Sequence, residues 1–175
     1  MQSALSLHIS VDTAAVGETG SASVRDAEQP TDHGTLHFSL RHDASASALA
    51  VTVVKATGLP AGDAESFNAY VKVRLLPEKH HKAKTRVVRR SVDPVFDETL
   101  TFAGVDAERL QRSGAAVRLS VLKSDAFSKD QLIGELLFSL HDVDLQSQTD
   151  ISVVRPLSHG VGKVKHINSY IRTCS

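Results

Sequence analysis

The sequence predicts an all-β protein, an eight-stranded antiparallel β-sandwich, and three observations support this fold class. Short segments alternate apolar and polar residues with a period of two, as strands with one face in a core do. Clusters of Gly, Pro, Asp and Ser separate the segments. The period of 3.6 that marks an amphipathic helix is almost absent. Many short strands divided by turn signals are typical of a sandwich.

The alternating pattern begins just after Gly34. In residues 36–42, the apolar Leu36, Phe38 and Leu40 alternate with polar residues, so the three are expected to face the core. Residues 48–56 repeat the pattern and predict a second strand. Turn-forming residues lie between the two segments, which favours an antiparallel pair.

A polar face is expected on the next two strands. Residues 69–77 place Tyr70, Lys72 and Arg74 on the side that faces away from the core. Residues 82–88 predict a fourth strand, also with cationic side chains on one face. A turn containing Pro77 separates the two.

The fifth segment carries an irregularity. In residues 95–103, Leu100 and Phe102 look inward, but Glu98 shares their parity, which predicts a β-bulge near Glu98. Residues 106–114 are expected to make one or two helical turns. The remaining predicted strands are residues 116–122, 132–140 and 149–157.

Length and composition indicate a single domain. The chain has 175 residues, 41% hydrophobic and 23% charged, which is ordinary for a globular protein. Its single cysteine excludes an intrachain disulfide, and its net charge of zero means that any electrostatic function must come from local clusters. The expected parts are a flexible leader over residues 1–33, a domain over 34–157, and a basic, loose tail over 158–175.

Five motifs stand along the chain in a fixed order: GTLHFSL, GLPAGD, AYVKVRLLPEK, KTRVVRRSVDPVFDETLTF and FSKDQLIGE. Together the motifs resemble a C2 domain, and more narrowly the first C2 domain of the synaptotagmin four and eleven branch, over about residues 34–146. The resemblance implies an eight-stranded sandwich with calcium-binding loops at one end and membrane binding as its task.

The calcium site implied by the resemblance is degenerate. The family uses five aspartates, and two of those positions keep one here. Calcium takes about six to eight oxygen ligands, several from carboxylates, so no calcium cofactor is expected. The retained aspartates are Asp63 and Asp125, the lost positions hold Asn68, Lys123 and Gln131, and Asp130 lies one residue before the last position.

The end loops carry two further expectations. Lys123 is expected to neutralise Asp63 and Asp125 in place of the metal, while the alternative is that loop aspartates cap turns. The resemblance makes Phe127 the membrane-inserting tip, with packing against Leu132 as the alternative.

A cluster of basic residues predicts a calcium-independent lipid surface. Such a patch attracts anionic head groups by about 1 kcal/mol per cation, and phosphoinositides most, whereas the alternative is an ordinary solvated strand face. Nucleic acid is not expected as a partner, because aromatic residues that stack on bases are scarce there. The cations are Lys72, Arg74, Lys79, Lys82, Lys84 and Arg86.

The sequence therefore predicts a non-enzymatic binding module, since no catalytic or zinc-ligand motif is present. Its expected task is calcium-independent binding of phospholipids, phosphoinositides or SNARE proteins in vesicle trafficking or exocytosis. Its expected location is cytoplasmic, peripheral to a vesicle or the plasma membrane, with no transmembrane segment. Two alternatives stay open: residual calcium-dependent phospholipid binding, and a protein–protein adaptor without lipid affinity.

Overall fold

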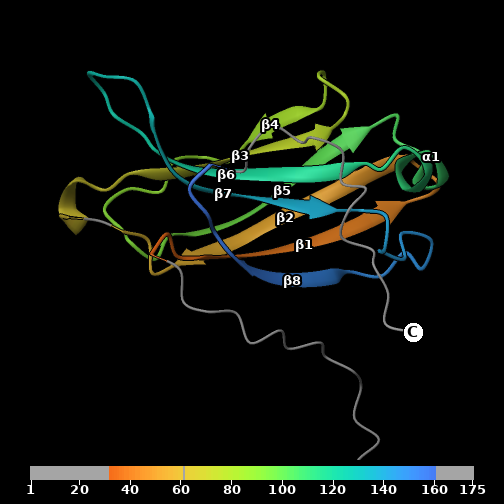
Figure 1. Ribbon diagram of the computed structural model, residues 1–175, viewed down its shortest axis with the longest axis horizontal. Helices are drawn as coiled ribbons and strands as arrows, with labels where there is room; N and C mark the ends of the chain where they lie inside the picture. Colours follow the sequence, from red (N-terminus) through yellow and green to blue (C-terminus); the bar gives the residue numbers. More distant parts are fainter. Residues whose placement is uncertain (1–31, 61, 161–175) are drawn as a thin grey trace, which may run out of the picture.

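Two four-stranded antiparallel sheets pack face to face in the computed structural model, which describes residues 32–60 and 62–160 (Figure 1). One sheet has the order β5-β2-β1-β8 and the other β4-β3-β6-β7. The predicted all-β sandwich is confirmed. The strands are β1 Thr35–Asp43, β2 Ala48–Thr57, β3 Ala69–Leu76, β4 Lys82–Lys84, β5 Val95–Ala103, β6 Ala116–Lys123, β7 Gln131–Ser139 and β8 Ile151–Pro156, with a 3₁₀ turn η1 Ala64–Ser66 and a helix α1 Ala107–Arg112.

The core lies between the sheets and is built from the alternating apolar positions. Leu36, Phe38 and Leu40 of β1 are all buried, as their period of two predicts. The ring of Phe38 meets Phe138 of the opposite sheet edge to face, with centroids 5.5 Å apart. Because every strand contributes one apolar face, the outer faces are left for polar side chains.

The predicted bulge is present in β5 and directly precedes Glu98. Val53 of β2 pairs with Glu98 and Lys55 pairs with Val95, so two residues of β5 oppose one residue of β2. Asp97 takes up the extra length with a φ of 45°, in the left-handed region. Phe96 beside it stays fully buried. The bulge thus keeps Phe96 in the core.

The fourth strand is shorter than the predicted 82–88 and ends at Lys84. Thr85, the next residue, is buried. Its side-chain hydroxyl oxygen accepts a hydrogen bond from the Val71 N–H at 3.0 Å, whereas in a regular antiparallel ladder a backbone carbonyl would accept it. The Thr85 N–H still donates to the Val71 carbonyl. A side chain therefore interrupts the ladder, which period-two reasoning does not detect.

Two loops gather at one end of the sandwich, and α1 lies at the other (Figure 1). The β2–β3 loop, residues 58–68, carries η1. It meets the β6–β7 loop, residues 124–130, where the Ser124 N–H donates to the Asn68 carbonyl at 2.7 Å. Within residues 32–60 and 62–160, no helix has the length and apolar character that a membrane span requires.

The expected leader and tail fall mostly outside the described residues. The final described segment leaves β8 and crosses to the other sheet, where Ser158 and Glu135 exchange two backbone hydrogen bonds of 2.8 and 3.0 Å. Gly134 permits this crossing, because a Cβ there would lie 2.9 Å from the Leu157 Cβ.

Candidate functional site

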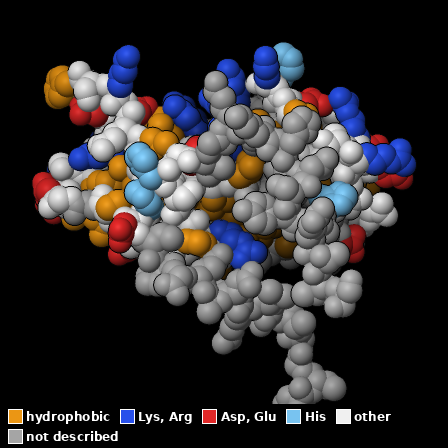
Figure 2. All heavy atoms as spheres, in the orientation of Figure 1, with side chains coloured by type: hydrophobic (Ala, Val, Ile, Leu, Met, Phe, Trp, Pro, Cys, Tyr) orange, Lys and Arg blue, Asp and Glu red, His pale blue; other side chains and the backbone are white. Residues whose placement is uncertain are grey.

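A cationic groove lies on the outer face of β3 and β4. Lys72 pairs directly with Lys84, and Arg74 with Lys82, so four cations meet across two strands. Like charges directly opposite each other destabilise a sheet, so this arrangement is costly without an anionic partner. Together with Ala83 the four line a hollow of about 360 Å³, within the roughly 300–1,000 Å³ of ligand sites. Figure 2 shows Lys and Arg side chains projecting along this side of the molecule.

The β3–β6 register reveals one cation that sequence reasoning missed. Arg118 of β6 pairs with Arg74, which places it on the same sheet face as the groove. It is half-buried. The alternation in AVRLSVL indicates that Arg118 faces outward. It does not indicate that Arg118 lies beside Arg74, because strand order depends on contacts between distant parts of the chain.

Lys79 and Arg86, the two remaining predicted cations, do not line the groove. Lys79 is exposed in the turn between β3 and β4. Arg86 follows the end of β4, and its guanidinium lies 3.8 Å from the carboxylate of Glu98 on the opposite sheet. The backbone N–H of Arg86 also donates to Glu98 at 2.8 Å. The prediction that Arg86 shares the cationic face is therefore corrected: the strand ends too early, and Glu98 holds the side chain at the sandwich edge.

Tyr70 lies on the outer, groove side of β3, as expected, but it is buried there, with 4% of its surface exposed. Two of the groove lysines lie over its ring. The ammonium groups of Lys72 and Lys84 lie 5.5 and 5.7 Å from its ring centroid, within cation–π range. Its hydroxyl donates a hydrogen bond to Asp130. Burial, together with this bond, raises the pKa of Tyr70 to about 12.

The phenol of Tyr70 is expected to titrate late. Its raised pKa means that the fold favours the protonated form. The resulting stabilisation is complete below the ordinary pKa of about 10 and is lost as the pH rises through about 12. In Asp130→Asn the midpoint should fall towards 10, remaining above it because burial persists. Phenolate absorbance measures this, and Tyr70→Phe identifies the step, since the chain has two tyrosines. An identical late step in Tyr70→Phe would contradict the assignment.

Asp63 and Asp125 both cap turns in the end loops. A carboxylate oxygen of Asp63 accepts the Glu65 N–H at 3.0 Å at the start of η1. Asp125 accepts the Phe127 N–H at 2.9 Å, and this bond is the main cause of its lowered pKa. Among the residues that the structure describes, no group of three or more His, Cys, Asp or Glu side chains is placed to hold a metal ion.

The positions that lost an aspartate also have structural roles. Asn68 joins the two loops through its carbonyl, and Gln131 pairs with Lys123 at the base of the β6–β7 loop. The Lys123 ammonium lies 5.7 Å from the ring centroid of Phe67 and forms no ion pair with Asp63 or Asp125. Its charge is the smallest cause of the lowered Asp125 pKa. The expectation that Lys123 neutralises both Asp63 and Asp125 is therefore wrong, because its ammonium lies over Phe67.

Phe127 lies at the tip of the β6–β7 loop and is fully exposed, at 101% of the reference surface. It does not pack on Leu132, so that alternative is excluded. Transfer of an exposed phenylalanine side chain from water to an apolar environment is favourable by about 1.5–3 kcal/mol. The loop therefore presents a single apolar tip at the end of the molecule that also carries Asp63 and Asp125.

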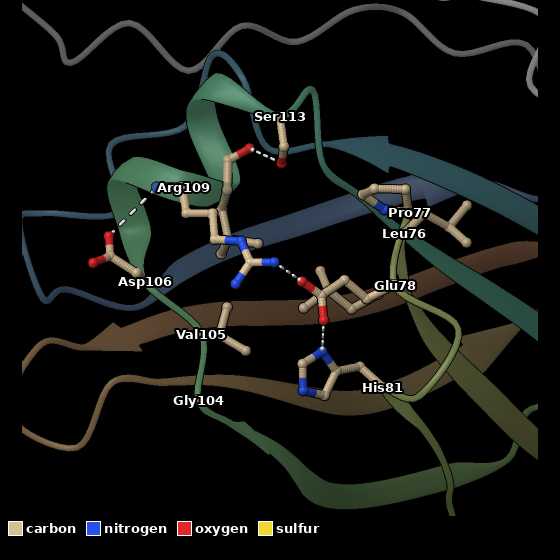
Figure 3. Close-up of a pocket in the computed structure, with 11 residues that line it drawn as sticks. Leu76, Pro77, Glu78, His81, Gly104, Val105, Asp106, Arg109 and Ser113 are labelled. Atoms are coloured by element: carbon tan, nitrogen blue, oxygen red, sulfur yellow. Dashed lines mark hydrogen bonds and ion pairs between the residues drawn. The ribbon is translucent and has the colours of Figure 1, made fainter.

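A small pocket lies at the opposite end, between the β3–β4 turn and α1 (Figure 3). One carboxylate oxygen of Glu78 lies 2.8 Å from Arg109 of α1, and the other lies 3.5 Å from the His81 imidazole. The cavity has a volume of about 70 Å³, which is too small for a head group. Glu78 thus links the β3–β4 turn to α1.

The fold and site define a β-sandwich binding module with two end loops and a basic lateral face. The C2 domain family model matches residues 47–154, and the chain belongs to the C2 domain family. It is 42% identical to human Synaptotagmin-4 over 127 residues, and 40% identical to human Synaptotagmin-11 over 130 residues. These matches cover 71% and 73% of this chain, but 29% and 30% of those relatives, so the chain spans less than a third of their length.

Solved structures agree with this assignment. A C2 domain of the RIM protein from Drosophila superposes with a TM-score of 0.61 at 26% identity, covering 70% of this chain and 97% of that one. The third C2 domain of KIAA1228 protein gives a TM-score of 0.66 at 24% identity, covering 84% and 98%. The predicted resemblance to synaptotagmin-type C2 domains is confirmed.

Proposed function

We propose that this C2 domain binds anionic phospholipid membranes, and phosphoinositides most strongly, through the groove of Lys72, Arg74, Lys82 and Lys84. The observation that carries the proposal is the direct pairing of these four cations across β3 and β4. No ion pair within the described part of the chain neutralises Arg74 or Lys82. Their charge is therefore available to a phosphate.

The electrostatics favour a multiply phosphorylated head group. Each cation near an anionic membrane contributes about 1 kcal/mol, so four contribute about 4 kcal/mol. Several phosphates on one inositol ring reach several cations at once, whereas a neutral lipid offers no net charge. Phe127 adds an apolar contact when the loop end meets the bilayer.

The end loops support binding that is independent of calcium. The carboxylates of Asp63 and Asp125 already accept backbone N–H groups, and the carboxylate of Asp130 accepts the Tyr70 hydroxyl. Lys123 adds a positive charge at the same end. The groove requires no metal to carry its charge, so membrane attraction persists when calcium is removed.

The proposed setting is peripheral attachment to a vesicle or the plasma membrane from the cytoplasm, in trafficking or exocytosis, without enzymatic activity. This rests on the similarity to Synaptotagmin-4 and Synaptotagmin-11. An acidic protein such as a SNARE protein would meet the same cationic face. Lipid and protein ligands would then compete for it.

Vesicle sedimentation in the presence of a chelator tests the proposal. The protein should pellet with phosphoinositide vesicles, less with phosphatidylserine vesicles, and not with phosphatidylcholine vesicles. Added salt should weaken the binding, because the Debye length falls from about 10 Å at 0.1 M to about 3 Å at 1 M. A protein that stays in the supernatant with every vesicle, yet binds an acidic SNARE segment, would be an adaptor.

A further inference from the structure

A side-chain hydrogen bond fastens the β6–β7 loop to the cationic groove. Asp130, the last residue of the loop, accepts the hydrogen bond of Tyr70, which lies 60 positions earlier in the chain. The ring of Tyr70 lies beneath the ammonium groups of Lys72 and Lys84. The loop that ends in this contact also carries the exposed Phe127. Groove and apolar tip are thus joined through Tyr70 and Asp130.

The electrostatic environment of Asp130 matches this arrangement. Its pKa is lowered chiefly by the Tyr70 hydrogen bond, and further by the charges of Lys72 and Lys84. The carboxylate is therefore ionised at neutral pH, and the two lysines whose charges act on it also line the groove. Arg74 and Lys82 pair at the next position along the strands, and neither forms an ion pair within the described residues. One end of the groove is partly neutralised and the other is not.

Resting on the proposed function, we propose that Asp130 is a built-in counter-anion of the groove. A head-group phosphate entering the groove repels the Asp130 carboxylate from its place beside Tyr70, and this repulsion moves the loop that carries Phe127. A phosphate and a carboxylate near the same two lysines repel each other, so occupancy of the groove by a phosphate disfavours the anchored position of Asp130. The state in which a phosphate occupies the groove and the state in which Asp130 anchors the loop therefore oppose each other.

Two consequences follow from this exclusion. Because coupling between two sites is reciprocal, weakening the anchor must strengthen ligand binding. Removing the Asp130 charge should tighten binding by about threefold per ligand charge, the Coulomb effect expected at roughly 6 Å in water. The loop tip should also report groove occupancy without a membrane, since the phosphate acts on Asp130 directly.

A single-tryptophan variant measures both effects. The chain has no tryptophan, and Phe127 is fully exposed, so Phe127→Trp introduces one reporter at the loop tip. Soluble inositol trisphosphate is titrated in chelator, with fluorescence reporting the tip and calorimetry reporting binding. The variants in this background are Asp130→Asn and Tyr70→Phe. The matched control is Asp142→Asn, an exposed aspartate in the segment after β7.

In the parent and in Asp142→Asn, binding should change the tryptophan emission. Asp130→Asn should bind more tightly and show little emission change, and Tyr70→Phe should show the shifted emission before ligand is added. Two results would overturn the inference and leave the proposed function standing. One is binding seen by calorimetry without a change in tryptophan emission, and the other is an Asp130→Asn affinity equal to that of Asp142→Asn. No binding by any variant, and none to phosphoinositide vesicles, would instead overturn the proposed function on which it rests.

Discussion

Replacing Lys82 and Lys84 together with glutamate is expected to abolish sedimentation with phosphoinositide vesicles in chelator. The two residues provide half of the groove and pair with Arg74 and Lys72. The double reversal changes the groove by four charge units, which is about 4 kcal/mol, or roughly a thousandfold in affinity. Both side chains are exposed, so stability should change little.

Reversing two positive charges elsewhere on the surface distinguishes an effect of the groove from an effect of net charge. Arg41→Glu with Arg112→Glu produces the same change in net charge, from zero to minus four, on exposed residues of β1 and α1. This control should sediment nearly as the parent does. Equal pelleting of the Lys82 and Lys84 double variant and the parent would show that the membrane meets another surface.

Phe96→Ala is expected to destabilise the domain by about 3–5 kcal/mol, the range for deleting a buried aromatic ring. Phe96 is fully buried and lies at the β5 bulge, where Asp97 takes a positive φ to keep it inside. The cavity would open beside the edge strand, whose Glu98 holds Arg86. Denaturant unfolding followed by circular dichroism gives the change in free energy.

Val95→Ala is the internal control for this measurement. Val95 is the preceding residue in the same strand, but 57% of its surface is exposed. Its truncation should change the free energy of unfolding by no more than about 0.5 kcal/mol. Similar losses for both variants would contradict the inward placement of Phe96 and the bulge that produces it.

The fold followed from the sequence because it depends on local alternation. Leu36, Phe38 and Leu40 are buried where a period of two places them. The pattern failed at Thr85, where a hydroxyl replaces a carbonyl in the ladder, and at Tyr70, where neighbouring side chains cover an outward position. Both depend on side-chain contacts across strands, and alternation along one strand carries no information about them.

The candidate site was partly predictable for the same reason. The groove required only the outward parity of two adjacent strands, and its four cations were placed correctly. The role of Asp130 was not predictable, because its partner Tyr70 is distant in sequence and approaches through strand order. Lys123 was misassigned since residue spacing does not show that its ammonium lies over Phe67. Contacts between loops depend on tertiary geometry that motif spacing leaves undefined.

The most direct test compares the affinity for phosphoinositide vesicles in chelator with that in calcium at roughly 10⁻⁵ M, the upper end of the sensor range. A groove that carries its own positive charge predicts the same affinity in both solutions. Binding that appears only when calcium is added would contradict it, and would assign the membrane contact to the loops of Asp63 and Asp125.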